Sequence, residues 1–113
     1  MRRGEIRWYK FKAPDKKRPV LILTRDSILE YLGEVTVAPI TTTIRDIPSE
    51  VFLSKHDDMP EDCAINFDHV QTVSKAKIGS LITTLPPEKL KQVRTAILFA
   101  LNLLTGIQTT RER

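Results

Sequence analysis

The residues best suited to phosphate chemistry in this sequence are an arginine and a run of threonines. Arg18 stands where a basic turn enters an apolar segment, directly before Pro19, and Thr41, Thr42 and Thr43 follow a later apolar segment. A guanidinium can bind a phosphate through two hydrogen bonds, and hydroxyl groups can donate to the remaining oxygens. Strand ends beside loops are where a rigid scaffold presents such side chains. Spacing alone does not bring Arg18 and Thr41 together, so an ordinary arginine at a strand end stays the alternative.

Other reactive side chains form weaker patterns. His56, Asp57 and Asp58 are the densest group of possible metal ligands, but they match neither zinc-site nor EF-hand spacing and favour a solvated acidic turn. Cys63 opens an apolar segment, which is typical of a small buried side chain. Imidazole titrates near neutral pH, so His56 and His69 are possible acid–base groups, although structural or solvent-facing roles are favoured. We expect a site without a metal or another cofactor.

Charge is unevenly distributed along the 113 residues, whose formal net charge is +4. Residues 1–25 carry +7, residues 26–70 carry −8 and residues 71–113 carry +5. A basic N-terminal block is typical of contact with a polyanion, most often a nucleic acid. The alternative is a solvated basic surface that keeps a small protein in solution.

Length and composition indicate one globular domain over residues 1–113. The hydrophobic content of 41% and the charged content of 28% are those of an ordinary folded protein and exclude wholesale disorder. The single cysteine excludes an intramolecular disulfide framework. The charged start at residues 1–5 is unlike a signal peptide, and the apolar run at 96–104 is far shorter than the ~20 residues that cross a bilayer. We expect a soluble, cytoplasmic protein with no membrane segment.

Several short apolar segments separated by turns predict a mainly β fold, built as a small barrel. Loose alternation predicts a half-buried strand over 4–11, and the continuous apolar run at 19–24 predicts a strand buried on both faces. A short helix capped by Asp26 is expected at 26–32, closed by Gly33, and Pro39 implies an edge or a bulge in the strand at 34–41. The remaining strands are expected at 47–53, as the hairpin partner of 34–41, and at 63–67, 70–73 and 79–85.

The last segment predicts a helix over about 87–105. Pro86 and Pro87 favour its start, and Thr105-Gly106 favours its end. Residues 96–104 are apolar on nearly every side of such a helix, which must therefore be covered on every side. Either the helix packs deep against the sheet or a second subunit covers the spare face. For so small a chain we favour the second subunit.

Four sequence blocks occur in a fixed order. They are Arg-Gly-Glu-Ile at 3–6, Lys-Arg-Pro-Val-Leu-Ile at 17–22, the block at 37–51 that holds the threonine run, and the block at 66–73 that begins Asn-Phe-Asp-His. Together with the final helix, they resemble the signature blocks of the MazF/PemK (Kid) toxins. The resemblance extends over about residues 3–105.

The resemblance implies an endoribonuclease toxin of a type II toxin–antitoxin pair, an mRNA interferase that inhibits translation and growth. The family folds as an SH3-like β-barrel, here about residues 3–85, with a C-terminal helix at about 87–105, and works as a homodimer. Its members cut single-stranded RNA without metal through the adjacent 2′-OH, leaving 2′,3′-cyclic phosphate and 5′-OH ends. A cognate acidic antitoxin neutralises them. The family's catalytic arginine falls on Arg18 and its catalytic threonine on Thr41.

The turn before Arg18 departs from the family. Many relatives carry a longer Gly-rich loop there, with an acidic residue that helps to bind RNA, whereas this chain offers only Asp15. Trp8 is either a core side chain, which is favoured, or a platform on which a base stacks. The residues expected to bind RNA are Lys12, Asp15, Lys16, Lys17, Thr42, Thr43 and Arg45.

Three other classes of function compete with this interpretation. A non-catalytic RNA-binding barrel would keep the basic groove but would not cleave. A gyrase-poisoning toxin of the same superfold would act through its C-terminus, and the tail at 109–113 lacks the aromatic or apolar anchor for this. A purely structural interaction domain has no need of Arg18 and Thr41.

Overall fold

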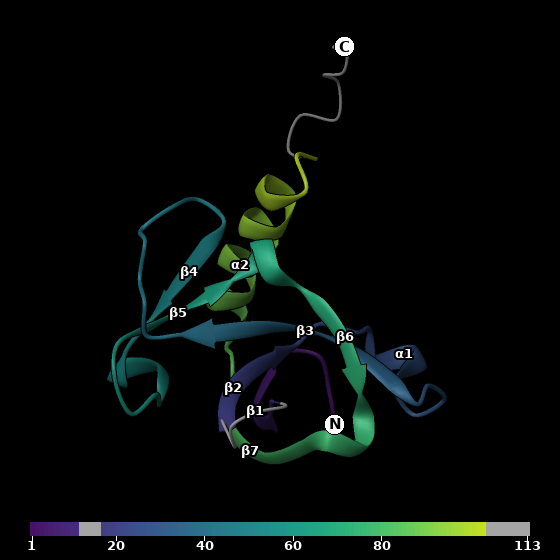
Figure 1. The fold of residues 1–113 in the computed structure, drawn as a ribbon. Helices are drawn as coiled ribbons and strands as arrows, with labels where there is room; N and C mark the ends of the chain where they lie inside the picture. The colour runs from purple at the N-terminus through teal and green to yellow at the C-terminus, as the bar shows by residue number, and fades with distance from the viewer. Residues whose placement is uncertain (12–16, 104–113) are drawn as a thin grey trace.

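The chain forms an antiparallel sheet of seven strands with a helix, α2, packed against it (Figure 1). The computed structural model describes residues 1–11 and 17–103. The strands are β1 (Glu5–Lys10), β2 (Lys17–Ile22), β3 (Glu34–Thr41), β4 (Glu50–Leu53), β5 (Cys63–Asn66), β6 (Gln71–Ser74) and β7 (Ile78–Thr84). The helices are α1 (Asp26–Leu29), α2 (Pro87–Ala100) and the 3-10 turns η1 (Lys55–Asp57), η2 (Phe67–His69) and η3 (Lys75–Lys77).

Strand β3 joins the parts of the sheet. The strand order is β4-β5-β3-β2-β1-β7, and β6 pairs with β3 as well. The mainly β fold with a C-terminal helix is confirmed, but the sheet is not closed into a barrel. It stays open because β4 and β7, at the two ends of this order, pair only with β5 and β1 within the described residues.

Pro39 lies at a gap between two partners of β3. Strand β6 pairs with Glu34 to Val37, and β5 pairs with Ile40 and Thr41, so this edge of β3 has no partner at Pro39. A proline has no N–H to donate to a ladder, and such a local edge accommodates it. The expectation of an edge at Pro39 therefore holds locally, although β3 is an interior strand.

Two local expectations are wrong. Strand β4 is not the hairpin partner of β3; it pairs with β5, which lies between them. All four residues of β5 are buried, and this interior position suits such a strand better than the edge does. Asp26 does not cap α1, because Arg25 is the N-cap and the Asp26 carboxylate instead accepts a hydrogen bond from the backbone N–H of Arg3 at 2.6 Å.

Strand β2 is buried on both faces, as its apolar run predicts. Leu21 packs on one face with a core cluster that includes Ile6 and Leu53. Val20 and Ile22 point to the opposite face, into a second cluster. None of the three β2 side chains has any solvent exposure. The two faces of β2 thus connect two hydrophobic cores.

Helix α2 covers the first of these cores. Its buried residues Val93 and Ala96 pack into the cluster around Leu21. Pro87 occupies the first turn, where a missing N–H has no intrahelical partner to lose. No helix within residues 1–11 and 17–103 has the length and apolar character needed to span a membrane.

Helix α2 ends at Ala100, five residues before the end that the Thr-Gly pair predicted. Asn102 adopts a positive φ of 58° and its N–H donates to the carbonyl of Phe99 at 2.9 Å. The N–H of Leu103 donates to the carbonyl of Leu98 at 2.6 Å, which completes a Schellman motif. Asparagine tolerates this left-handed conformation, so Asn102 ends the helix. Phe99, Leu101 and Leu103 are left exposed there, at 45%, 61% and 55%.

Leu21→Ala tests the core beneath β2 and α2. Leu21 is fully buried, so its truncation should lower the free energy of unfolding by about 2–5 kcal/mol. Leu81→Ala is the matched control, because Leu81 of β7 is 49% exposed and should lose less than about 1 kcal/mol. Urea unfolding followed by circular dichroism measures both values. Equal losses in the two variants would contradict this packing.

Candidate active site

The register between β2 and β3 brings Arg18 and Thr41 to the same level of the sheet. The ladder pairs Val20 with Pro39, and continuing it by two residues sets Arg18 opposite Thr41. Both residues line one pocket of about 220 Å³. The fold therefore brings together the two residues that the sequence could not connect.

Three chain segments surround this pocket. They are the facing ends of β1 and β2, the end of β3 with the residue after it, and the segment that leads into β5. The lining residues are Trp8, Lys17, Arg18, Pro19, Ile40, Thr41, Thr42, Met59, Pro60, Glu61 and Cys63. This site pocket thus combines cationic, hydroxyl, aromatic and carboxylate groups.

The Thr41 hydroxyl is oriented by the backbone two residues further along the chain. Its Oγ1 accepts a hydrogen bond from the N–H of Thr43 at 3.0 Å. A hydroxyl has one hydrogen to donate and two lone pairs to accept with. Oγ1 accepts in this bond, and its own hydrogen donates to no group within the described residues. The hydrogen is therefore available for an oxygen of a ligand in the site pocket. Thr43 does not line the pocket, but it positions Thr41.

The cationic side of the site pocket is formed by β2. Arg18 is exposed, and its guanidinium makes no hydrogen bond or ion pair with the part of the chain described here. The Nζ atom of Lys17 lies 5.8 Å from the centroid of the Trp8 ring, within cation–π range. Trp8 is half-buried on the pocket wall, so the favoured prediction of a core tryptophan is only partly met.

The other predicted RNA-binding residues lie elsewhere or outside the described residues. Arg45 does not line the site pocket: its backbone N–H donates to Glu50 at 3.0 Å, and its guanidinium lies 3.6 Å from the same carboxylate. Lys12, Asp15 and Lys16 belong to the part of the chain that the structure does not describe. Of the seven predicted RNA-binding residues, Lys17 and Thr42 line the pocket.

Sequence reasoning missed the wall formed by Met59, Pro60 and Glu61. These residues follow η1, and the left-handed conformation of Asp58 (φ 66°) turns the chain before them. The acidic turn itself was visible in the sequence. Its position against Arg18 was not, because the two are more than forty residues apart and meet only through the pairing of β5 with β3.

The histidines and their neighbouring acids serve other contacts. His69 Nδ1 lies 3.1 Å from the side-chain nitrogen of Asn66, and His56 donates its backbone N–H to Ser54. Asp57 accepts from the backbone N–H of Ser54 at 2.9 Å and closes a capping box. Neither histidine lines the site pocket.

Cys63 is a buried thiol on the pocket wall rather than a nucleophile. It is 3% exposed, and burial, reinforced by the nearby charges of Glu61, Asp62 and Asp57, raises the pKa of its thiol from 9.0 to about 11. The thiolate is the reactive form of cysteine, and it is scarce at neutral pH under these conditions. This agrees with the structural role that the sequence favoured.

Fold and site together define a small β protein with one pocket lined by both an arginine and a threonine. A family model described as the PemK-like, MazF-like toxin of type II toxin–antitoxin systems matches residues 2–101. The chain belongs to this family. The toxin and endoribonuclease class predicted from the sequence is thereby confirmed.

Individual relatives agree with this assignment. The chain is similar to the probable endoribonuclease MazF2 of Mycobacterium tuberculosis, at 39% identity over 93 residues, which are 81% of this chain and 89% of the relative. The solved structure of M. tuberculosis toxin MazF-mt6 matches with a TM-score of 0.81 and 34% identity, over 88% of this chain and 97% of the other. An endoribonuclease in complex with its cognate antitoxin, from a mycobacterial species, shares the fold at a TM-score of 0.80 and 24% identity, over 91% and 96%.

The raised pKa of Cys63 predicts a loss of stability at alkaline pH. An unfolded chain releases the thiol proton near pH 9, whereas the folded chain retains it to about pH 11, so ionisation favours the unfolded state in this interval. The free energy of unfolding should fall between pH 9 and 11 by up to about 1.4 kcal/mol per pH unit more in the wild type than in Cys63→Ala. Denaturant titrations from pH 8 to pH 11 measure the difference. Parallel curves over this range would contradict the burial of the thiol.

Proposed function

We propose that this chain cleaves single-stranded RNA at the site pocket, with Arg18 and Thr41 as the catalytic pair. The observation that carries the proposal is the shared lining of one pocket by two residues on different strands. Membership of the toxin family supports the substrate class. We place this activity in the cytoplasm, where it would stop translation and growth.

The proposed reaction uses the 2′-OH next to the scissile phosphate. The 2′-oxygen attacks phosphorus after losing its proton, and the bond from phosphorus to the 5′-oxygen breaks. A 2′,3′-cyclic phosphate and a 5′-OH result, once the leaving oxygen has taken up a proton. Negative charge accumulates on the phosphoryl oxygens at the transition state, and groups that bind this charge lower the barrier.

Arg18 and Thr41 suit the stabilisation of that charge. A guanidinium fits phosphoryl oxygens through two parallel hydrogen bonds, and Arg18 has no partner in the described structure that it would have to give up. The Thr41 hydroxyl adds a neutral donor, already oriented by Thr43. Arginine stays protonated in proteins, so it is not the base that takes the 2′-OH proton. Arg18 supplies the positive charge that metal ions supply in other nucleases.

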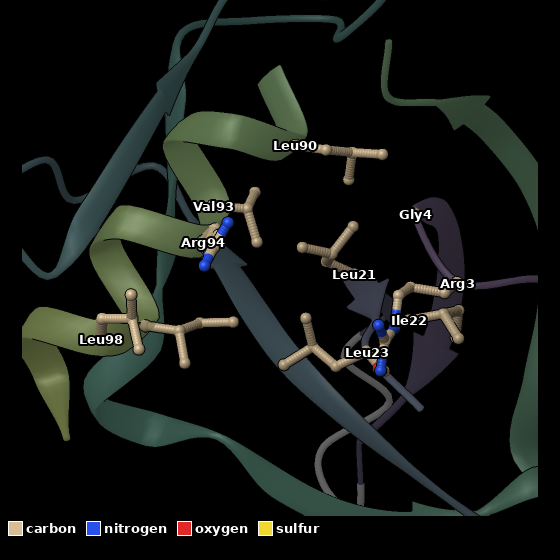
Figure 2. Close-up of a pocket in the computed structure, with 10 residues that line it drawn as sticks. Arg3, Gly4, Leu21, Ile22, Leu23, Leu90, Val93, Arg94 and Leu98 are labelled. Atoms are coloured by element: carbon tan, nitrogen blue, oxygen red, sulfur yellow. The ribbon is translucent and has the colours of Figure 1, made fainter. Parts of the chain in front are cut away.

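We infer further that two copies of the chain associate through the face between β2 and α2. A second, larger cavity of about 480 Å³ lies there (Figure 2). Its walls are mostly apolar: Leu21, Ile22 and Leu23 line it from β2 and the residue after it, and Leu90, Val93, Ile97 and Leu98 line it from α2. Phe99 and Leu101, at the end of α2, are exposed large apolar side chains as well. Exposed apolar surface of this kind is typical of association between subunits.

An acidic antitoxin segment is the proposed inhibitor. The basic N-terminal quarter of the chain contributes Lys17 and Arg18 to the site pocket. An acidic, initially disordered segment laid across this surface would occupy the position of the RNA phosphates. Inhibition would then follow from direct competition for the same charges.

Arg18→Ala tests the proposed catalytic residue. Loss of one such transition-state contact typically lowers the rate by on the order of 10²–10³. Arg18 is exposed and unpaired in the described structure, so the variant should retain the thermal melting curve of the wild type. Lys91→Ala, which removes an exposed charge of α2 far from β2 in sequence, is the control and should cleave normally. Cleavage of a long RNA by Arg18→Ala at the wild-type rate would overturn the assignment.

Cleavage in a chelator tests the proposed chemistry. Because Arg18 and Thr41 provide the charge stabilisation, cutting of a long RNA should proceed equally well in EDTA. The products should carry 5′-OH ends, which ligation-based sequencing identifies directly. Loss of activity in EDTA with recovery on adding Mg²⁺ would replace the proposed mechanism by a metal-dependent one.

A further inference from the structure

We infer that Glu61 determines the base specificity of cleavage. The base beside the scissile phosphate stacks on Trp8, and Glu61 binds the edge of that base and discriminates against uracil. The inference rests on the proposed RNA cleavage and adds a recognition role that Arg18 and Thr41 do not supply. It arises from the lining residues of the site pocket that phosphate binding does not use.

Most of these residues are apolar or aromatic. They include Trp8, Pro19, Ile40, Met59 and Pro60. A phosphate gains nothing from such walls, whereas a nucleobase stacks on an aromatic ring and packs against aliphatic groups. The pocket, at about 220 Å³, is large enough for one base and too small for several. Arg18 and Thr41 would hold the adjoining phosphate.

Glu61 is the carboxylate of this pocket, and it has no partner in the described chain. Two acids that precede it are engaged: Asp57 lies 3.8 Å from Lys89 Nζ, and Asp58 accepts from the Thr83 hydroxyl at 3.0 Å. Glu61 is exposed and makes no hydrogen bond or ion pair with residues 1–11 and 17–103. Its acceptors are therefore available to a ligand.

A carboxylate beside an RNA backbone is unfavourable unless it meets hydrogen-bond donors. Glu61 repels the phosphates that Arg18 and Lys17 attract. An ionised carboxylate only accepts hydrogen bonds. In single-stranded RNA its natural partners are the N–H groups on the Watson–Crick edge of an unstacked base. Glu61 thus makes the binding of RNA depend on which base lies beside the phosphate.

The chemistry of the bases then gives the direction of the choice. Guanine, cytosine and adenine each present an amino group to a carboxylate, and guanine presents an adjacent ring N–H as well. Uracil presents one N–H between two carbonyl oxygens, which face the carboxylate with like partial charge. Glutamine differs from glutamate in offering one donor beside its acceptor, so it matches the N–H and carbonyl of uracil. Glu61→Gln should therefore admit uracil.

The test maps the cuts made in a long RNA by the wild type and by Glu61→Gln. In the wild type, uracil should be depleted by about tenfold at one position flanking the cut, the usual size of discrimination by one base contact. In Glu61→Gln the depletion should disappear. Glu88→Gln, an exposed acid of α2 outside the pocket, should retain the wild-type pattern. An unchanged base pattern in Glu61→Gln would overturn the inference.

A binding measurement separates this inference from the proposed cleavage. Trp8 is the only tryptophan of the chain, so its fluorescence reports occupation of the pocket. Oligomers with 2′-deoxyribose bind without being cut, and the wild type should bind the cytosine form more tightly than the uracil form. Glu61→Gln should remove this preference even if the wild type cleaves no RNA. Equal binding of both forms by the wild type would refute the recognition role. A Glu61→Gln variant that loses all cleavage but still binds the cytosine form more tightly than the uracil form would refute it as well.

Discussion

Burial of β2 on both faces is the constraint on which the site depends. Val20 and Ile22 fill one core and Leu21 fills the other. A slip of one residue would turn every one of these side chains to the wrong face, so the pairing of β2 with β3 has one stable register. That register carries Arg18 to the level of Thr41. The geometry of the proposed catalytic pair is thus a consequence of core packing and needs no contact between the two side chains.

The structure shows which charged residues of the sequence are paired with one another and which are not. Several acids of the middle block are used by the scaffold: Glu50 with Arg45, Asp57 with Lys89, and Asp68 with the Ser49 hydroxyl at 2.6 Å. Arg18 and Lys17 of the basic block have no such acid partner within residues 1–11 and 17–103, and both line the site pocket. The net charge of the chain predicts a polyanion only weakly, whereas this division between engaged acids and available bases points to a particular surface.

The sequence predicts local structure well and long-range pairing poorly. The strands at 5–10, 17–22 and 34–41 follow from alternation and apolar runs, which neighbouring residues determine. The position of β5 between β3 and β4 depends on contacts across the whole sheet, and no local pattern contains it. The early end of α2 depends on Asn102, a weaker stop signal than the Thr-Gly pair that follows it. Arg18 and Thr41 were predicted as site residues from the family resemblance. The place of Glu61 in the pocket follows only from the pairing of β5 with β3.

The site pocket divides its tasks between two kinds of structure. Arg18 and Thr41 stand at strand ends, where the register of the sheet fixes them and substitutions in loops would leave them in place. Met59, Pro60 and Glu61 lie on a connection, which tolerates changes in sequence more readily than a strand does. This connection is nevertheless anchored, because Asp58 accepts from Thr83 of β7 and Asp57 lies beside Lys89 of α2. In the proposed reaction, the sheet would set the phosphate chemistry and an anchored loop would set base recognition, so the recognised base could change while the reaction is retained.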